Sequence, residues 1–149
     1  MRDILIVGGG LNGPSLALAL APAGHSVTLI DALPAPTRED ADFDGRSYAL
    51  ALASARLFQQ IGVWSRIEAH AQPMNEIKVS DGIAGRGPSP LFLHFEESDL
   101  DEGPMGYMVE DRYLRRALLK ALDAEPKITQ ISGQRVIAQT VSTDAVTVT

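Results

Sequence analysis

The sequence contains no cysteine, and this absence excludes several kinds of chemistry at once. Disulfide frameworks, thiolate metal sites and cysteine nucleophiles all require a thiol. Basic residues are also scarce, with 13 lysines and arginines against 19 acidic residues and a net charge of -6. Proteins that bind nucleic acid usually carry a basic surface, so we expect no nucleic-acid partner. The lack of cysteine suits a reducing compartment, and we expect a cytoplasmic protein.

The chain also lacks a long uninterrupted hydrophobic run, although residues 4–30 contain no lysine, arginine, aspartate or glutamate. Glycines, prolines, Asn12 and His25 interrupt this uncharged segment. A membrane-spanning helix needs about 20 consecutive apolar residues. A secretory signal needs a basic start, whereas Arg2 is followed by Asp3. We therefore expect neither a span nor a signal peptide, while a peripheral contact with the inner membrane stays open.

What the sequence does have is a strand–turn–helix–strand pattern over residues 4–31. Residues 4–7 are apolar without polar alternation, which is typical of a strand buried on both faces of a parallel sheet. Residues 14–23 are rich in alanine and leucine, which favours a helix packed closely on that sheet. A second apolar strand, residues 26–30, leads to Asp31. This order predicts a right-handed β-α-β unit.

The turn after the first strand has the spacing Gly8-x-Gly10-x-x-Gly13. In nucleotide-binding turns of this kind the first glycine permits a tight turn and the second lets the backbone approach a pyrophosphate. The third lets the helix pack against the strand. The free N–H groups and the dipole of the helix then attract the phosphates. Because an acid also ends the next strand, we interpret the segment as a dinucleotide site rather than a structural glycine turn.

Three charged residues are candidates for the same site. The Asp31 carboxylate can accept both hydroxyls of an adenosine ribose and would repel a ribose phosphate, which argues against NADPH here; a helix cap or loop acid is the alternative. Arg46 has a forked guanidinium suited to a pyrophosphate, and the alternative is an ion pair with Asp42 or Asp44. Arg112 lies in the first turn of a predicted helix, where a positive charge is unfavourable beside the helix dipole. This position indicates a ligand contact, and a solvent-exposed side chain is the alternative.

The remaining pattern departs from a nicotinamide-binding Rossmann domain, because the strand–helix alternation does not resume until Ile128. We expect a loop at 31–44, helices at 48–61 and 111–124, a helical turn at 63–71, and strands at 75–80, 91–95, 105–109, 128–131, 135–141 and 146–149. Asp111 is expected to cap its helix, with Leu114, Leu118 and Leu122 facing inward. The histidines lack metal-like spacing, and we assign neither a metal site nor a catalytic side chain.

Four segments carry a resemblance to a known family: ILIVGGGLNGPSLALALAPAGHSVTLID, DGRSYALALASARLFQQIGVW, NEIKVSD and GYMVEDRYLRRAL. The chain resembles the N-terminal part of the flavin-dependent aromatic hydroxylases of the para-hydroxybenzoate hydroxylase fold, and within them the ubiquinone-biosynthesis group. The first segment is shared by many flavoproteins, whereas the second and fourth are more specific to the hydroxylases. Together the segments follow the family's order and cover most of the chain.

The resemblance implies an α/β fold, in which a Rossmann-like FAD-binding β-α-β unit with a parallel sheet is joined by inserted antiparallel strands and a β-meander. It also implies that the ADP half of FAD contacts the glycine turn, the acid after the second strand and two arginines. These residues are Gly8, Gly10, Leu11, Asn12, Gly13, Asp31, Arg46 and Arg112. Family members usually carry glutamate where this chain has Asp31, a small departure because the two acids are chemically equivalent.

The same resemblance implies an NAD(P)H-dependent monooxygenase that uses molecular oxygen to hydroxylate a small aromatic substrate, a polyprenylated phenol of ubiquinone biosynthesis. The family's later Asp-Gly and Gly-Asp motifs and its substrate domain do not occur in this sequence. We therefore expect residues 1–149 to be the incomplete N-terminal portion of an FAD-binding domain, inactive alone. The alternatives are a halogenase, epoxidase or geranylgeranyl-type reductase of the same fold, or a non-catalytic nucleotide-binding fragment. Association with a biosynthetic complex also stays open.

Overall fold

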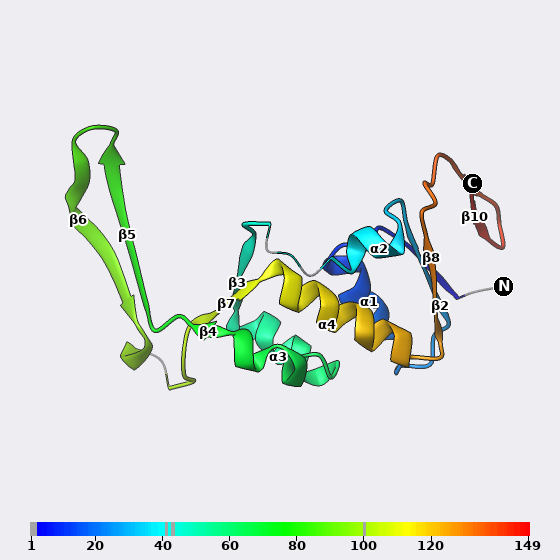
Figure 1. The fold of residues 1–149 in the computed structure, drawn as a ribbon, viewed down its shortest axis with the longest axis horizontal. Coiled ribbons are helices and arrows are strands. Elements are labelled where there is room, and N and C mark those ends of the chain that lie inside the picture. Colours follow the sequence, from blue (N-terminus) through cyan, green and yellow to red (C-terminus); the bar gives the residue numbers. More distant parts are fainter. Residues whose placement is uncertain (1–2, 41, 43, 100) are drawn as a thin grey trace.

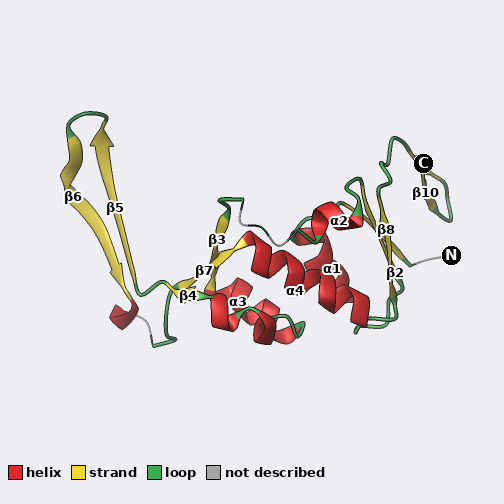
Figure 2. Cartoon of the chain, viewed as in Figure 1, coloured by secondary structure: helices red, strands yellow, loops and turns green. Residues whose placement is uncertain are grey.

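The computed structural model describes residues 3–40, 42, 44–99 and 101–149. Figure 1 shows a parallel sheet at one end, a small antiparallel sheet in the middle and a long hairpin that projects at the other end. Figure 2 shows the helices gathered between the parallel sheet and the hairpin. The glycine turn, described below, belongs to the end that carries the parallel sheet.

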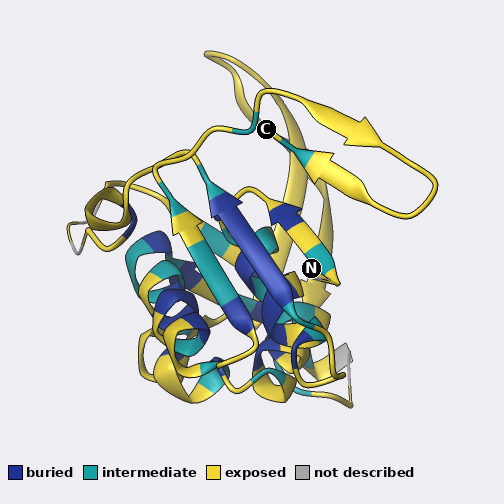
Figure 3. Cartoon of the chain, turned by 90° about the vertical axis from the view of Figure 1, so that its right-hand side faces the viewer, coloured by how far each residue is buried: buried dark blue, intermediate teal, exposed yellow. Residues whose placement is uncertain are grey.

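Three parallel strands form one sheet in the order β1 (Ile4–Val7), β2 (Val27–Asp31) and β8 (Ile128–Ser132). The middle strand is buried from Val27 to Ile30, and Figure 3 shows it between two more exposed neighbours. It pairs with β1 from Ile4↔Val27 and with β8 from Val27↔Ile128. The predicted β-α-β unit is confirmed, and a strand distant in sequence joins its sheet.

Helices α1 (Asn12–Leu20) and α4 (Asp111–Ala124) pack against each other beside this sheet. Leu114, Leu118 and Leu122 of α4 are no more than 1% exposed, which confirms the inward face predicted from their spacing. Burying one such side chain stabilises a fold by about 1.5–3 kcal/mol, so this row of leucines holds α4 in place. α1 begins two residues before the expected start, because the glycine turn leads directly into its first turn.

The segment 48–61 was expected to be one helix, and its first part is instead a strand. β3 (Ser47–Ala51) pairs antiparallel with β7 (Gly106–Glu110), and α3 (Leu52–Gln60) starts only after it. β7 also pairs with β4 (Gln72–Pro73) in the sheet order β3-β7-β4. Pairing with β7 overrides the helix propensity of this alanine-rich sequence, and the inward residues Tyr48 and Leu50 alternate with exposed ones as a strand requires.

Two other segments are more helical than expected. The expected loop 31–44 contains α2 (Ala35–Arg38), a short helix that follows Pro34 at its N-cap. The expected turn at 63–71 consists of two short 3-10 helices, η1 (Trp64–Arg66) and η2 (Glu68–His70). α2 matters for the site, because it carries the side chain of Arg38 toward the end of β2.

The hairpin consists of β5 (Glu76–Ile83) and β6 (Gly87–Glu96), and η3 (Glu97–Asp99) follows it. Its strands are longer than expected because Asp81 and Gly82 lie at a register shift between Ser80 and Gly82 rather than at the turn. The sequence predicted a half-buried strand here, whereas β5 is exposed along its whole length. Two-stranded hairpins are marginally stable alone, so these strands gain little from the described core.

The end of the chain also differs from the expected meander. β9 (Gln139–Val141) and β10 (Val146–Val148) form an antiparallel hairpin, and residues 135–138 are not part of a strand. The strand before them, β8, joins the parallel sheet through β2 instead of pairing with β9. Within the described ranges, every helix is too short or too polar to cross a membrane.

Candidate cofactor-binding site

The glycine turn has the geometry that its spacing predicted. Gly8 has a φ of +111°, in the region that side chains rarely adopt, and its N–H donates to the Ile30 carbonyl at 2.8 Å. A Cβ at Gly13 would lie 1.9 Å from the Gly8 carbonyl oxygen, so only glycine allows this close approach of helix and turn. A Cβ at Gly10 would instead meet no atom within 4 Å. The backbone at Gly10 therefore borders open space.

That open space consists of two adjoining cavities at the carboxyl end of the parallel sheet. One has a volume of about 350 Å³ and extends from Asp31 to Arg115. The other, of about 590 Å³, follows the turn, and both share Gly10, Leu11 and Tyr48 as lining residues. Six of the residues predicted to contact FAD line one or both cavities: Gly8, Gly10, Leu11, Asn12, Gly13 and Asp31.

The start of α1 faces the second cavity without a side-chain cap. Asn12 and Gly13 line that cavity, and no side chain caps the helix start at Leu11. The first N–H groups of any helix have no partner within the helix. A helix N-terminus of this kind attracts an anion through these N–H groups and through the helix dipole.

Asp31 is held in a fixed orientation at the end of β2. One carboxylate oxygen accepts the Gly9 N–H at 2.5 Å and the other accepts the Leu33 N–H at 2.7 Å. The role of a loop acid, weighed above, is therefore present in the structure. Each carboxylate oxygen can accept a second hydrogen bond, so these contacts leave capacity for two ligand hydroxyls.

Arg46 lines the first cavity, and acidic neighbours hold it. Its Nη2 lies 2.5 Å from an Asp44 oxygen and 3.4 Å from an Asp111 oxygen, and its side chain is 59% exposed. The hydrogen bonds from Arg46 lower the pKa of Asp44. The hydrogen bond to Asp44 and the charge of Asp111 in turn raise the pKa of Arg46. The ion pair with Asp44 is thus confirmed, and it does not oppose a ligand contact, because exposed pairs of this kind are weak and exchangeable.

Asp111 was expected to cap α4, and that prediction is wrong. Glu110 takes the N-cap position without a side-chain cap bond, and Asp111 is the first residue of the helix. Its buried carboxylate accepts from Arg115 Nε at 2.8 Å and from the Tyr48 hydroxyl at 3.2 Å. Burial and this nearby carboxylate raise the pKa of Tyr48. The Asp111 carboxylate therefore accepts hydrogen bonds from Arg115 and Tyr48 and not from the backbone N–H groups in the first turn of α4.

Among the residues that the structure describes, Arg112 is not part of the lining of either cavity. Its Nε donates to Glu110 at 2.6 Å, and its guanidinium lies 4.8 Å from the centre of the Tyr113 ring. The α4 arginine that lines the first cavity is Arg115, one turn later. The contact of Arg112 with FAD stays a prediction from the family resemblance.

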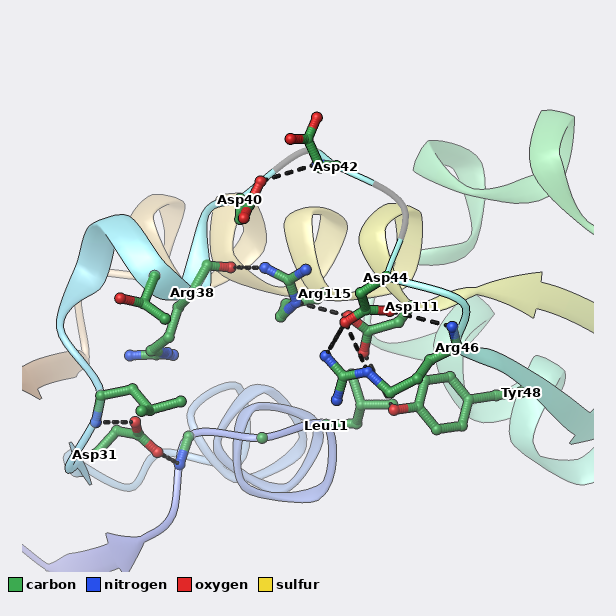
Figure 4. A pocket seen from close by; sticks show the side chains of 14 residues that line it. Leu11, Asp31, Arg38, Asp40, Asp42, Asp44, Arg46, Tyr48, Asp111 and Arg115 are labelled. Carbon is green, nitrogen blue, oxygen red and sulfur yellow. Dashed lines mark hydrogen bonds and ion pairs between the residues drawn. The ribbon is translucent and has the colours of Figure 1, made fainter.

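The residues of the first cavity that the sequence did not assign to the site include Arg38, Tyr48, Asp111 and Arg115. Asp111 and Arg115 are four residues apart on a helix, a spacing that places opposite charges together and could have revealed the pair. Arg38 is only 5% exposed, although it lies in a proline-rich segment that reads as an exposed loop. Figure 4 shows these side chains around the cavity, with Arg38 above Asp31 and Arg115 beside Asp111.

Comparison with known proteins identifies the family of this chain. A family model described as an FAD binding domain matches residues 1–149. The chain belongs to this family of FAD-binding domains. FAD is the cofactor of the domain, and the residues fit it: a glycine turn open at Gly10, an uncapped helix start and a carboxylate at Asp31.

Relatives of this FAD-binding domain include two hydroxylases. The ubiquinone hydroxylase UbiL of Rhodospirillum rubrum is 44% identical over 149 residues, which is 100% of this chain and 33% of that protein. The 3-demethoxyubiquinol 3-hydroxylase of Escherichia coli K12 is 37% identical over 129 residues, 85% of this chain and 32% of that protein. The chain thus spans about a third of the length of the curated relatives it matches.

A solved structure supports the fold of the FAD-binding domain. The p-nitrophenol 4-monooxygenase PnpA from Pseudomonas putida DLL-E4 superposes with a TM-score of 0.73 over 99% of this chain and 35% of that chain. The two sequences are 18% identical, so the likeness concerns the fold alone. It agrees with the α/β architecture of parallel sheet and inserted antiparallel strands.

Proposed function

We propose that the protein containing this domain is an FAD-dependent monooxygenase that hydroxylates an aromatic ring. The observation that carries the proposal is the pair of adjoining cavities, which joins an anion-binding helix start to a ribose-type carboxylate. The identity of 44% to a ubiquinone hydroxylase supports hydroxylation as the reaction. A polyprenylated phenol as substrate, NAD(P)H as reductant and a peripheral contact with the membrane or a biosynthetic complex rest on the family resemblance.

Each part of the site has a separate task toward the ADP half of FAD. The N–H groups at the start of α1 donate to the pyrophosphate, and the open space at Gly10 lets the backbone approach it. Asp31 accepts the hydroxyls of the adenosine ribose with the capacity left beside Gly9 and Leu33.

Arg46 supplies positive charge to the pyrophosphate after it leaves Asp44. Both side chains are exposed, with relative exposures of 59% and 42%, so water replaces the ion pair at small cost. Asp111 stays bound to Arg115 and Tyr48 and keeps the wall of the cavity in place. The bound flavin supplies the redox chemistry that passes electrons from NAD(P)H to oxygen. We assign no catalytic side chain to residues 1–149.

The test is flavin content together with turnover. The purified full-length protein that contains this domain should be yellow, and with NAD(P)H and oxygen it should add one hydroxyl group to a prenylated phenol, detected by mass spectrometry. A colourless protein that FAD does not reconstitute would refute the proposal. A yellow protein that oxidises NAD(P)H without hydroxylating any phenol would keep FAD binding and refute the assigned reaction.

A further inference from the structure

Arg38 is a buried cation that has no task in the site as described so far. Its residue is 5% exposed, and Nη1 donates to the Ser132 hydroxyl at 3.1 Å. Nε and Nη2 are also buried, and neither has a hydrogen-bond partner among the residues that the structure describes. A buried donor without an acceptor is costly, so these two N–H groups call for an acceptor from outside the described chain.

The unpaired edge of the Arg38 guanidinium lies beside the Asp31 side chain. A Cβ built at Gly9 would lie 2.9 Å from Arg38 Cζ and 2.9 Å from Asp31 Cβ, so both side chains flank the same backbone position. Both residues also line the first cavity. Figure 4 shows the Arg38 guanidinium between α2 and Asp31, above the turn.

The chemistry of the two side chains is complementary. Nε–H and Nη2–H form one edge of the planar guanidinium, and that edge donates to two adjacent oxygens. Ionised Asp31 only accepts, and Arg38 only donates. A vicinal diol offers two adjacent oxygens that each donate one proton and still accept. Neither residue alone satisfies such a diol, whereas the two together do.

We propose that Arg38 is the second half of a ribose clamp. Its Nε–H and Nη2–H donate to the 2′ and 3′ hydroxyl oxygens of the adenosine ribose, whose protons Asp31 accepts. The proposal rests on the proposed binding of the ADP half of FAD at this site. The same fork also suits a ribose phosphate, but the Asp31 carboxylate in the same corner repels that dianion. The diol is therefore the occupant, and Ser132 orients Arg38 toward it through Nη1.

The test compares ADP with 2′,3′-dideoxy-ADP on purified protein freed of flavin, by isothermal titration calorimetry. The unmodified protein should bind the dideoxy compound at least about tenfold more weakly. Arg38→Lys keeps the charge but loses the fork. It should bind ADP about tenfold more weakly and bind the dideoxy compound almost unchanged, so its discrimination falls about tenfold and only the share supplied by Asp31 remains. Arg86→Lys, at the exposed tip of the β5–β6 hairpin, is the matched control and should leave both affinities unchanged.

The outcomes separate the clamp from the site as a whole. If Arg38→Lys keeps the full discrimination, or weakens both ligands equally as a contact to the base would, the clamp is overturned. Binding of neither ADP nor FAD to the unmodified protein would overturn the proposed function itself. If melting shows that Arg38→Lys does not fold, the Arg38 Nε–H resonance of the unmodified protein decides. It should shift with ADP and stay in place with 2′,3′-dideoxy-ADP, and equal shifts would reject the clamp.

Discussion

Two glycines of the same turn should respond to alanine in opposite ways. At Gly10 a Cβ would meet no atom within 4 Å, and the φ of Gly10 is not positive. At Gly13 a Cβ would lie 1.9 Å from the Gly8 carbonyl oxygen and 3.1 Å from a Leu29 methyl group. Gly10→Ala should therefore affect the ligand and spare the fold, whereas Gly13→Ala should affect the fold first.

The magnitudes follow from these contacts. Overpacking of the kind at Gly13 typically costs about 1–3 kcal/mol, and about 2–4 °C of melting temperature is lost per kcal/mol in a chain of this size. Gly13→Ala should thus melt about 2–12 °C lower. Gly10→Ala should melt within about 2 °C of the unmodified protein, because its methyl group occupies open space. That methyl group keeps the pyrophosphate from one charged backbone hydrogen bond, worth about 1.5–3 kcal/mol, or about 10- to 100-fold in ADP affinity.

The assay is differential scanning fluorimetry of both variants, followed by calorimetric titration with ADP. The two measurements together separate a folding defect from a binding defect. If Gly10→Ala bound ADP as tightly as the unmodified protein, the pyrophosphate would not lie against this backbone. If Gly13→Ala melted at the unmodified temperature, the close approach of α1 to the turn would be wrong.

Three further perturbations test other parts of the site and core. Asp31→Ala should weaken FAD binding, measured by flavin fluorescence, by about one to two orders of magnitude, and an unchanged Kd would place the ribose elsewhere. Asp44→Asn should tighten FAD binding about two- to fivefold, because it releases Arg46 and removes a negative charge; weaker binding would contradict this. Arg46 holds the pKa of Asp44 below its usual value, so the pair stabilises the fold at neutral pH and loses its effect as the pH falls through that lowered pKa. The melting difference between Asp44→Asn and the unmodified protein should therefore shrink as the pH is lowered through that pKa. Leu118→Ala should cost about 2–5 kcal/mol in urea unfolding, and a loss below 1 kcal/mol would mean that α4 packs loosely.

The β-α-β unit could be predicted from the sequence because all of its signals are local. The apolar run at 4–7, the glycine spacing and the acid at Asp31 each act within a few residues of one another. β3 could not be predicted in this way, because it is a strand only through its pairing with β7, whose residues come much later in the chain. Short alanine-rich segments take the structure that their partners impose.

Some charged residues of the site can also be predicted from local sequence, whereas others depend on distant partners. Asp111 and Arg115 form an i,i+4 pair that a helical projection reveals, although the cap assignment for Asp111 concealed it. Arg38 was beyond sequence reasoning, since its burial depends on α2 and on Ser132, which is 94 residues away. A buried arginine is rare unless it is paired, so composition alone gives no reason to look for one in a proline-rich loop.

The pairing of β2 with β8 has a consequence for the order in which the chain folds during synthesis. β2 finds β1 within the first 31 residues, but its other edge has no partner until residues 128–132 have been made. An unpaired edge of an apolar strand is a template for wrong pairing, and long-range parallel pairing is slow. Asp31 and Ser132 are register partners in that late pairing, so the corner that holds Arg38 forms only after residue 132 has been made. Synthesis speed over residues 32–127 thus bears on whether the ribose end of the site is assembled correctly.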